Sequence, residues 1–327
     1  MRNYMANSIW KSYPKLGEKL DLTTDFIHQE VKIQNLDISK MIVDLTSGGK
    51  MLRPAFFLLF SDFGTTKKTT QELIPLAASI EILHVATLIH DDVIDDSPLR
   101  RSRPTIHTKY GRRNAIYAGD YLFTLYFELI SKNLQHNTDI LLNALSMKKI
   151  LVGELDQMLI NFNVEATTDM YFKEISGKTA ELFSLSAKMG AIFSNSSQEI
   201  VERCQNIGHD IGMAFQIIDD ILDFSSTSQT GKPVHEDLKN GVYSLPYILG
   251  LEAKNQKLIT ILSKNHLDDA DDRMAMQIVL DDGYLDQAKQ IARKFTDRAV
   301  VEIEKLPKNH NQVILKNVVK KLINRIK

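Results

Sequence analysis

The sequence predicts an all-α fold, because it contains few helix breakers, long segments with helical hydrophobic spacing and no convincing series of strands. Its 327 residues include only 15 glycines and 8 prolines. Apolar residues recur at three- and four-residue intervals in four long segments, as expected for helices. These segments are 72–92, 114–134, 200–224 and 311–327. We therefore predict a single large helical bundle over residues 1–327, with roughly ten or more helices.

Short polar linkers separate the predicted helices. They are "SDFGTTKKTT" (61–70), "SNSSQE" (194–199) and "SSTSQTGKPVHEDLKNG" (225–241). The last is the longest irregular stretch, and loops of that length are often functional. The sequence shows no Gly-rich strand–turn–helix unit and no internal repeat.

Composition argues against several classes of protein. The net charge is −1, so no overall positive field favours nucleic acid. The single cysteine, Cys204, rules out an intramolecular disulfide and suits a reducing compartment. The N-terminus lacks the apolar core of a signal peptide, and runs such as 55–60 are too short to cross a bilayer. We therefore expect a soluble, cytoplasmic protein that binds no nucleic acid.

The segment "LIHDDVIDDSPLRR" (88–101) concentrates four carboxylates, at Asp91, Asp92, Asp95 and Asp96. On a helix Asp91 and Asp95 share a face, as do Asp92 and Asp96, and like charges at this spacing repel each other. A divalent cation removes the repulsion. Magnesium needs only one or two protein carboxylates and completes its shell with water and substrate phosphate. The pattern therefore predicts a magnesium site if the chain also supplies a phosphate site.

A second acidic cluster repeats the Asp-Asp-x-x-Asp pattern at Asp219, Asp220 and Asp223, within "FQIIDDILDF". One cluster alone is better explained by a solvated acidic helix face or a helix end. Two clusters, each inside a strongly apolar helix, place carboxylates near the edge of the core, where they need cations. The repetition therefore favours a pair of metal sites.

Glu81 and His84 suggest a different metal site, because they form the i, i+3 pair of di-iron helical bundles. A di-iron site needs two such motifs and two further glutamates. The chain has only this one motif, so we disfavour the di-iron interpretation.

Basic residues near the first acidic cluster predict a phosphate site. Lys50 and Arg53 follow two glycines and precede Pro54, which suits the first turn of a helix, and helix N-termini attract anions. His84 lies seven residues before Asp91, on the same helix face and ~10 Å away along the axis. The spacing predicts two adjacent anion sites, one of them bound through metal.

Two further groups of cations are candidate phosphate ligands. Arg100 and Arg101 follow Pro98, which is expected to end the helix, and the arginine fork suits diphosphate. Without the acidic clusters, this pair is better explained as solvated surface cations.

Lys178 with Thr179, and separately Lys232, resemble the end of a phosphate-binding P-loop. A P-loop requires a glycine five residues before the Gly-Lys pair. Phe172 occupies that position before Lys178, and the segment before Lys232 also lacks this glycine. We therefore reject the P-loop and keep both lysines as candidate phosphate ligands, with solvated lysines as the alternative.

These motifs together resemble the trans-isoprenyl diphosphate synthase family, also called polyprenyl synthetases. The resemblance covers nearly the whole chain in family order, through "GGKMLRP", "HVATLIHDDVIDDSPLRRSRPTIH", "AGDYLF", "GKTAELF", "FQIIDDILDF" and "GKPVHEDLKNGVYSLP". It implies a large helical bundle with a central active-site cavity, of the isoprenoid synthase type and usually dimeric. It also implies a prenyltransferase that condenses isopentenyl diphosphate with an allylic diphosphate, using about three Mg²⁺ ions.

The resemblance implies roles for individual residues. Asp91, Asp95, Asp219 and Asp223 would bind magnesium. The allylic diphosphate would be held by Arg100, Lys178 and Lys232, and isopentenyl diphosphate by Lys50, Arg53, His84 and Arg101. The residues expected to act in catalysis are Lys178, Thr179 and Gln216, of which the last two would face the developing cation.

Product length depends on the space beneath the metal site. Ala86 and Thr87, one turn before Asp91, are small, whereas Leu83 is a partial stop one turn further. Shorter-chain members of the family often carry aromatic residues here, and many have lysine where this chain has Val242. We therefore predict a polyprenyl product of roughly thirty to forty carbon atoms, with a shorter geranylgeranyl or farnesyl product as the alternative.

Other interpretations remain open. A cyclase or head-to-head synthase shares the first aspartate motif but usually replaces the second, and it lacks the isopentenyl site. A non-catalytic regulatory subunit usually loses aspartates, and none is lost here. The chain is therefore expected to be a homodimeric synthase, or the catalytic subunit of a heterodimer that is inactive without a small regulatory partner.

The basic C-terminal segment has apolar residues at helical spacing, which are Ile314, Leu315, Val318, Val319, Leu322 and Ile326. This pattern predicts a terminal helix packed on the bundle. Transient contact with a membrane, for release of a lipid product, is the alternative.

Overall fold

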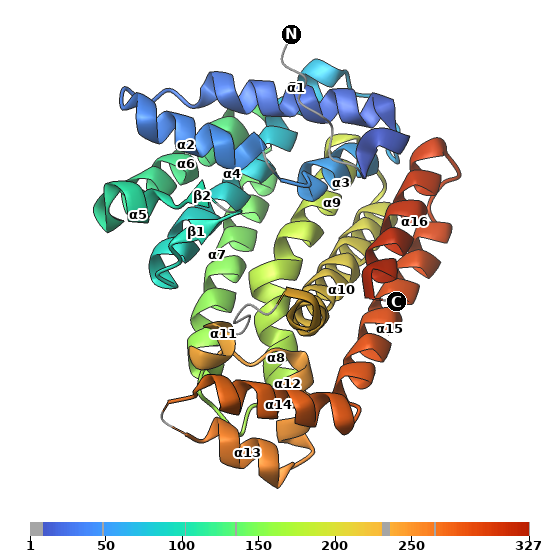
Figure 1. The fold of residues 1–327 in the computed structure, drawn as a ribbon. Coiled ribbons are helices and arrows are strands. Elements are labelled where there is room, and N and C mark those ends of the chain that lie inside the picture. Colours follow the sequence, from blue (N-terminus) through green and yellow to red (C-terminus); the bar gives the residue numbers. More distant parts are fainter. Residues whose placement is uncertain are drawn as a thin grey trace. The chain divides into compact units, whose positions relative to one another are not determined.

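The computed structural model describes residues 9–47, 49–101, 103–134, 136–230, 236–264 and 266–326. Across these ranges the chain forms sixteen α-helices, one π-helical turn and two short 3-10 helices. The strands described there, β1 (Leu99–Arg100) and β2 (Arg103–Pro104), form one antiparallel pair. The elements follow one another along the chain as coloured in Figure 1, and they confirm the predicted all-α class.

The chain divides into two compact units. The first contains the described residues up to Asn143 together with Ser186–Ser197, and the second contains Ala144–Leu185 together with the described residues from Gln198 onward. The division falls within α7 (Asn137–Ile160) and α9 (Glu181–Phe193). The single domain expected over residues 1–327 stays a prediction.

The other elements belong to one unit each. The first unit holds η1 (Trp10–Ser12), α1 (Pro14–Glu30), α2 (Leu36–Ser47), α3 (Leu52–Phe60), α4 (Thr70–Ile94), α5 (Ile106–Tyr110) and α6 (Arg112–Asn133). The second holds α8 (Thr168–Ile175), η2 (Ser176–Ala180), α10 (Gln198–Thr230), α11 (Glu236–Lys239), α12 (Leu245–Glu252), α13 (Gln256–Leu262), α14 (Asp269–Asp281), α15 (Tyr284–Glu304), α16 (His310–Ile323) and η3 (Asn324–Ile326).

Helix α4 is the core helix of the first unit and packs against α1, α3 and α6. It begins at a capping box, in which Thr69 and Glu72 each bind the other's backbone N–H. The short apolar runs led us to expect no segment able to cross a bilayer, but α4 is long and apolar enough to do so. Its few polar residues barely lower its average hydropathy. Of its most apolar window, 72% is buried inside the protein, and core helices of globular proteins pass the same test.

Helix α10 packs against α15, α16 and η2 in the second unit. It continues to Thr230, so the prediction of an irregular stretch from residue 225 was wrong. No glycine or proline lies between Gly212 and Gly231, and the Ser/Thr-rich sequence continues a helix that is already formed. The linkers predicted at 61–70 and 194–199 are confirmed except for their last residues, since residues 61–69 separate α3 from α4 and residues 194–197 separate α9 from α10.

Helix α16 packs against α15 and buries the apolar face that the sequence predicts. The buried residues of this face are Ile314, Leu315, Val318, Val319 and Leu322, followed by Ile326 in η3. The interpretation as a packed terminal helix is therefore confirmed.

Candidate functional site

The first aspartate cluster lies where α4 ends. Asp91 and Asp92 are in its last turn, Asp95 is the C-cap, and Asp96 has left the helix with a φ of 51°. The expectation that Asp92 and Asp96 share a helix face was therefore wrong. A helix C-terminus carries partial negative charge, so carboxylates here are unfavourable unless cations compensate them.

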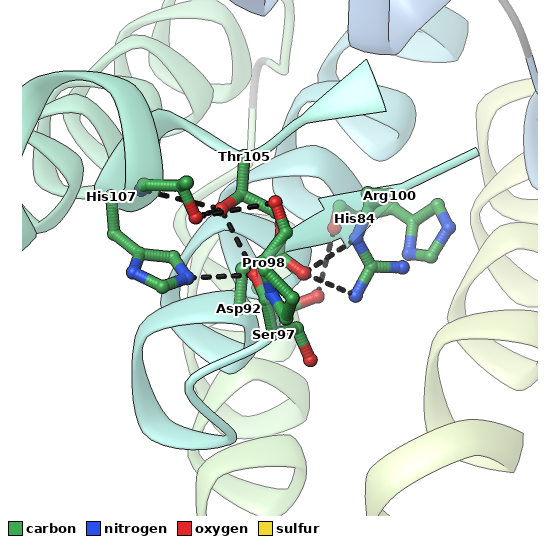
Figure 2. A network of polar contacts seen from close by, with 9 residues as sticks. His84, Asp92, Ser97, Pro98, Arg100, Thr105 and His107 are labelled. Carbon is green, nitrogen blue, oxygen red and sulfur yellow. Dashed lines mark hydrogen bonds and ion pairs between the residues drawn. The ribbon is translucent and has the colours of Figure 1, made fainter. Parts of the chain in front are cut away.

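Arginines bind the carboxylates of Asp92 and Asp96. Asp92, which is buried, accepts hydrogen bonds from Nε and Nη2 of Arg100, both at 2.7 Å (Figure 2). Asp96 accepts one from Arg112 at 2.8 Å at the exposed surface. Asp95 donates its backbone N–H to the Asp91 carbonyl at 2.8 Å. Asp91 and Asp95 thus keep the helical i, i+4 spacing that the sequence predicts for the metal-binding pair.

The loop that carries Arg100 is held by residues to which sequence reasoning gave no role. The Ser97 carbonyl accepts hydrogen bonds from His107 Nε2 at 2.7 Å and from the Thr105 hydroxyl at 3.0 Å, and the Pro98 carbonyl accepts one from the Thr105 backbone at 3.1 Å (Figure 2). These bonds attach the loop to the start of α5. In the sequence, Thr105 and His107 are marked only by the segment "RPTIH". This segment contributes to the family resemblance but shows no recognisable spacing pattern.

A cation cluster lies further back along α4 in the same unit. Arg53 Nη1 is 3.2 Å from His84 Nε2, and the Arg101 guanidinium lies 3.1 Å from where a Cβ at Gly49 would stand. Glu81, only 3% exposed, lies within the electrostatic reach of Arg53 and Arg101. The structure thus brings together three of the four residues expected to hold isopentenyl diphosphate. The fourth, Lys50, precedes α3 in the chain, while Arg53 lies in the first turn of that helix rather than in the loop before it.

The charges of this cluster exclude the di-iron interpretation. Burial lowers the pKa of His84 well below its ordinary value, and the charges of Arg53 and Arg101 lower it further. Burial raises the pKa of Glu81 to about 7, against the opposing effect of the same two arginines. A site crowded with guanidinium groups repels a metal cation and attracts an anion. The surroundings of the Glu81–His84 pair therefore suit an anion better than a pair of iron ions.

The second aspartate cluster lies on α10 in the second unit, and its middle member has a structural role. Asp220, 7% exposed, accepts hydrogen bonds from the Tyr171 hydroxyl at 2.7 Å, the Leu245 backbone at 2.9 Å and Gln216 Nε2 at 3.0 Å. Burial raises the pKa of Asp220 to about 6, although these hydrogen bonds lower it. Its acceptor capacity is largely used by the protein.

Asp219 and Asp223 are the two members at i, i+4 spacing, and both are more accessible than Asp220. Asp219 accepts a hydrogen bond from Arg325 in η3 at 3.2 Å. The sequence provides no local signal for this partner, because Arg325 lies more than a hundred positions away in the chain. The pair at helical spacing is again the one that the sequence predicts for metal.

Lys178 and Thr179 lie in the π-helical turn η2, and such turns recur at functional sites. Lys178 Nζ is 2.9 Å from the Glu154 carboxylate and donates to the Gln157 side-chain carbonyl at 2.8 Å, both on α7. The Thr179 hydroxyl donates to the Gln216 side-chain carbonyl at 2.8 Å. The structure therefore links Thr179 and Gln216 to Asp220 in one hydrogen-bond network, whereas Lys178, next to Thr179 in the chain, binds side chains of α7.

Close backbone contacts hold this π-helical turn in place. A Cβ added at Gly153 on α7 would lie 2.7 Å from the Gly177 carbonyl carbon, and one added at Gly177 would lie 2.9 Å from the Gly153 Cα. On the α10 side, a Cβ at Gly212 would lie 2.5 Å from the Ala180 Cα. Only glycine permits such an approach at these three positions. The turn is thereby fixed against α7 and α10.

We expect Glu174→Gln to make stability less dependent on pH. Burial raises the pKa of Glu174 to about 8, against the opposing charge of Lys178. A carboxyl with a raised pKa stabilises the fold while protonated, and this contribution is lost as the pH rises from the ordinary carboxyl range through about 8. The glutamine variant should melt near the wild type at pH 5 and above it at pH 9.

Thermal unfolding of both proteins over this pH range tests this prediction, with Glu165→Gln as the control, since Glu165 is an exposed glutamate of the same unit. The control should follow the wild type at every pH. Parallel curves for Glu174→Gln and the wild type would contradict the prediction.

The donor set at both aspartate pairs fits magnesium, because carboxylate oxygens are its preferred protein ligands and one or two per ion suffice. In the part of the chain that the structure describes, no group of three or more His, Cys, Asp and Glu side chains lies close enough to enclose a metal on its own. The remaining shell must then come from water and a phosphorylated ligand. Lys232 lies outside the described residues.

Comparison with known proteins identifies relatives along most of the chain. Residues 36–279 match the family model described as polyprenyl synthetase. Solanesyl-diphosphate synthase 2, chloroplastic, from Oryza sativa subsp. japonica is 37% identical over 285 residues, which are 86% of this chain and 70% of the relative. Heptaprenyl diphosphate synthase component 2 from Geobacillus stearothermophilus is 33% identical over 275 residues, which are 84% of this chain and 85% of the relative.

Among solved structures, geranylgeranyl pyrophosphate synthase from Lactobacillus brevis matches the fold with a TM-score of 0.92 at 42% identity. The match covers 97% of this chain and 99% of that one.

Proposed function

The chain belongs to the polyprenyl synthetase family, and we propose on this basis that it condenses isopentenyl diphosphate head to tail with an allylic diphosphate such as farnesyl diphosphate. It is a prenyltransferase, and the family resemblance inferred from its motifs is confirmed. The proposed product is an all-trans polyprenyl diphosphate of roughly thirty to forty carbon atoms, with release of diphosphate.

The observation that carries this proposal is that α4 bears a cluster of cations and an acidic pair along one helix. The cluster of His84 with Arg53 and Arg101 lies two turns before Asp91, or ~10 Å along the axis. One diphosphate held by cations and another held through metal would then lie at neighbouring positions. This is the requirement for joining two diphosphate substrates.

Asp91 with Asp95, and Asp219 with Asp223, would hold about three magnesium ions between them when substrate is bound. When bound, magnesium would neutralise the charge that develops on the departing diphosphate. The family resemblance implies that Lys178 and Arg100 would each bind diphosphate, in exchange for the carboxylates of Glu154 and Asp92 respectively. Lys232 keeps its proposed role in this group from the sequence alone.

Thr179 and Gln216 would stabilise the allylic cation. Because the Gln216 amide donates to Asp220 and the Gln216 carbonyl accepts from Thr179, the Thr179 oxygen keeps its lone pairs for a cation. The double bond of isopentenyl diphosphate would attack the cation in an apolar interior that excludes water. The proton released afterwards would go to the departed diphosphate, since neither cluster offers a carboxylate that is evidently placed as a base.

A product assay tests the proposed function. Purified protein is incubated with magnesium, farnesyl diphosphate and labelled isopentenyl diphosphate, and the dephosphorylated lipids are sized. A ladder that ends well beyond the fifteen carbons of farnesyl, and that chelator abolishes, is expected. A cyclic hydrocarbon in place of the ladder would contradict chain elongation.

We expect Thr87→Phe to shorten the product to roughly twenty carbons or fewer. Ala86 and Leu83 are fully packed, so of the residues proposed to set product length only Thr87 keeps an accessible surface. An aromatic ring there would occupy the path of the growing chain. Thr87→Val is the control, since it removes the hydroxyl bonded to the His84 carbonyl but adds no volume.

Lipid sizing by chromatography compares the two Thr87 variants with the wild type. The valine variant should keep the parent product. An unchanged ladder from a folded phenylalanine variant would show that Thr87 does not line the path.

Geranylgeranyl diphosphate is the second candidate product, favoured by the 42% identity to a geranylgeranyl pyrophosphate synthase. A further alternative is a catalytic subunit that needs a small partner, since one relative is named component 2 of a heptaprenyl synthase. The length of the longest product in the ladder tests the first alternative. Restoration of activity by an added small subunit tests the second.

Helix α7 supports assembly with a second subunit, identical or not. Its second-unit part exposes apolar side chains that are three, four or seven residues apart, which are those of Leu145, Val152, Leu155, Leu159 and the following Phe162. Exposed apolar patches of this kind mark protein interfaces. Size-exclusion chromatography with light scattering tests for a dimer.

We further propose a cytoplasmic location, no nucleic-acid partner and at most transient contact with a membrane.

A further inference from the structure

Trp10 joins the N-terminal segment to the loop that precedes α3. Its indole Nε1 donates a hydrogen bond of 2.7 Å to the backbone carbonyl of Lys50, forty positions along the chain. The side chain is 1% exposed and is the only tryptophan of the sequence. A buried indole N–H needs a partner, and here the partner is the main chain of a proposed substrate-binding residue.

The bond acts at a point where the backbone is unusual. Lys50 is followed by Met51, a non-glycine residue with a φ of 50° that caps the N-terminus of α3. A left-handed conformation is unfavourable for such a residue and persists only when its surroundings hold it. The indole bond is one of these restraints, because it fixes the carbonyl of the peptide group that enters Met51.

Restraining this loop also restrains the anion site. Arg53 lies two residues after Met51 and is 3.2 Å from His84, while Arg101 approaches Gly49 on the other side of Lys50. The same short segment therefore carries Lys50 and Arg53 and forms one wall of the Arg101 position. A shift of the Lys50 carbonyl would move cations relative to one another without removing any of them.

We propose that Trp10 is a positioning residue for the isopentenyl diphosphate site, acting through its bond to the Lys50 carbonyl. This inference rests on the proposed function, because it takes the cluster of Lys50, Arg53, His84 and Arg101 as the site of that substrate. It follows that occupancy of the site alters the environment of the indole. The chain then carries an intrinsic fluorescent reporter of one substrate and not of the other.

The kinetic test uses Trp10→Phe, which keeps an aromatic ring and removes the N–H donor. We expect KM for isopentenyl diphosphate to rise about fivefold, as for the loss of one ordinary hydrogen bond, with kcat and KM for farnesyl diphosphate nearly unchanged. A merely structural role would not separate the two KM values.

Tyr121→Phe is the matched control. Its hydroxyl accepts from the Lys32 backbone at 2.9 Å and donates to the Glu30 carbonyl at 3.3 Å, so it also anchors the main chain of the first unit, near the C-terminal end of α1. Both KM values of this variant should match the wild type.

The binding test needs no variant of Trp10 and so holds even if Trp10→Phe does not fold. Wild-type protein is titrated with isopentenyl diphosphate alone, and the tryptophan emission is recorded. A saturable change is expected, which farnesyl diphosphate does not reproduce and which Arg53→Ala shifts to much higher concentration.

Different results would contradict the proposed function and the proposed role of Trp10. The role of Trp10 would be overturned if wild-type protein elongates farnesyl diphosphate but its tryptophan emission does not change at saturating isopentenyl diphosphate. An unchanged KM for isopentenyl diphosphate in folded, active Trp10→Phe would also overturn it. Saturable emission changes in a protein that forms no elongated product, even after a small subunit is added, would instead contradict the proposed function and keep the coupling of Trp10 to the anion site.

Discussion

Asp91→Ala is expected to lower kcat for chain elongation by about a thousandfold or more, since metal neutralisation of a leaving diphosphate contributes several kcal/mol to the transition state. The fold should tolerate the change. Asp91 lies at the C-terminal end of α4, where a carboxylate is unfavourable beside the helix dipole and beside Asp95. The melting temperature should therefore stay near that of the wild type or rise slightly.

Asp96→Asn is the matched control for Asp91→Ala. It removes a charge from the same cluster, but Asp96 lies outside the helix and is paired at the surface with Arg112 at 2.8 Å. Surface pairs of this kind contribute little to stability. Steady-state kinetics at several magnesium concentrations compare the two variants. Equal losses in both, or full activity in Asp91→Ala, would contradict the assignment of Asp91 to the metal site.

Gly153→Ala is expected to reduce stability and activity together. The new Cβ would lie 2.7 Å from the Gly177 carbonyl carbon, so α7 and the π-helical turn must move apart. Overpacking of this kind costs about 1–3 kcal/mol. Lys178 and Thr179 lie on the displaced turn, and a shift of about 1 Å at a reacting site lowers the rate by roughly a hundredfold.

Gly250→Ala serves as the control for Gly153→Ala. Its Cβ would meet the end of the Leu258 side chain at 2.5 Å and the Tyr284 ring beyond 3 Å, and side chains can move where a backbone cannot. A helical Gly→Ala change also gains about 0.5–1 kcal/mol of backbone stability. Thermal melts and the elongation assay test both variants. Wild-type behaviour of Gly153→Ala would show that the turn can shift without loss.

The sequence predicted the fold class and most of the residues that the two clusters contain. Helical spacing in 72–92 and 200–224 identified α4 and α10, because hydrophobic periodicity is a local property. The same local argument failed where a helix ends. It extended the helical face to Asp96, although the backbone leaves α4 there, and it ended α10 before residue 225, although no breaker occurs until Gly231.

The sequence by itself determined which side chains lie one helical turn apart. Asp91 with Asp95 and Asp219 with Asp223 follow from the geometry of a single helix. The tertiary structure alone decided how the remaining polar groups are used. Asp92 binds Arg100, Asp220 is satisfied by Tyr171 and the Leu245 backbone, and Trp10 holds the Lys50 carbonyl. These contacts of Asp220 and Trp10 join positions at least 25 residues apart, and the Asp92–Arg100 pair spans the end of α4. Tertiary packing therefore creates them, and the spacing within a single helix cannot predict them.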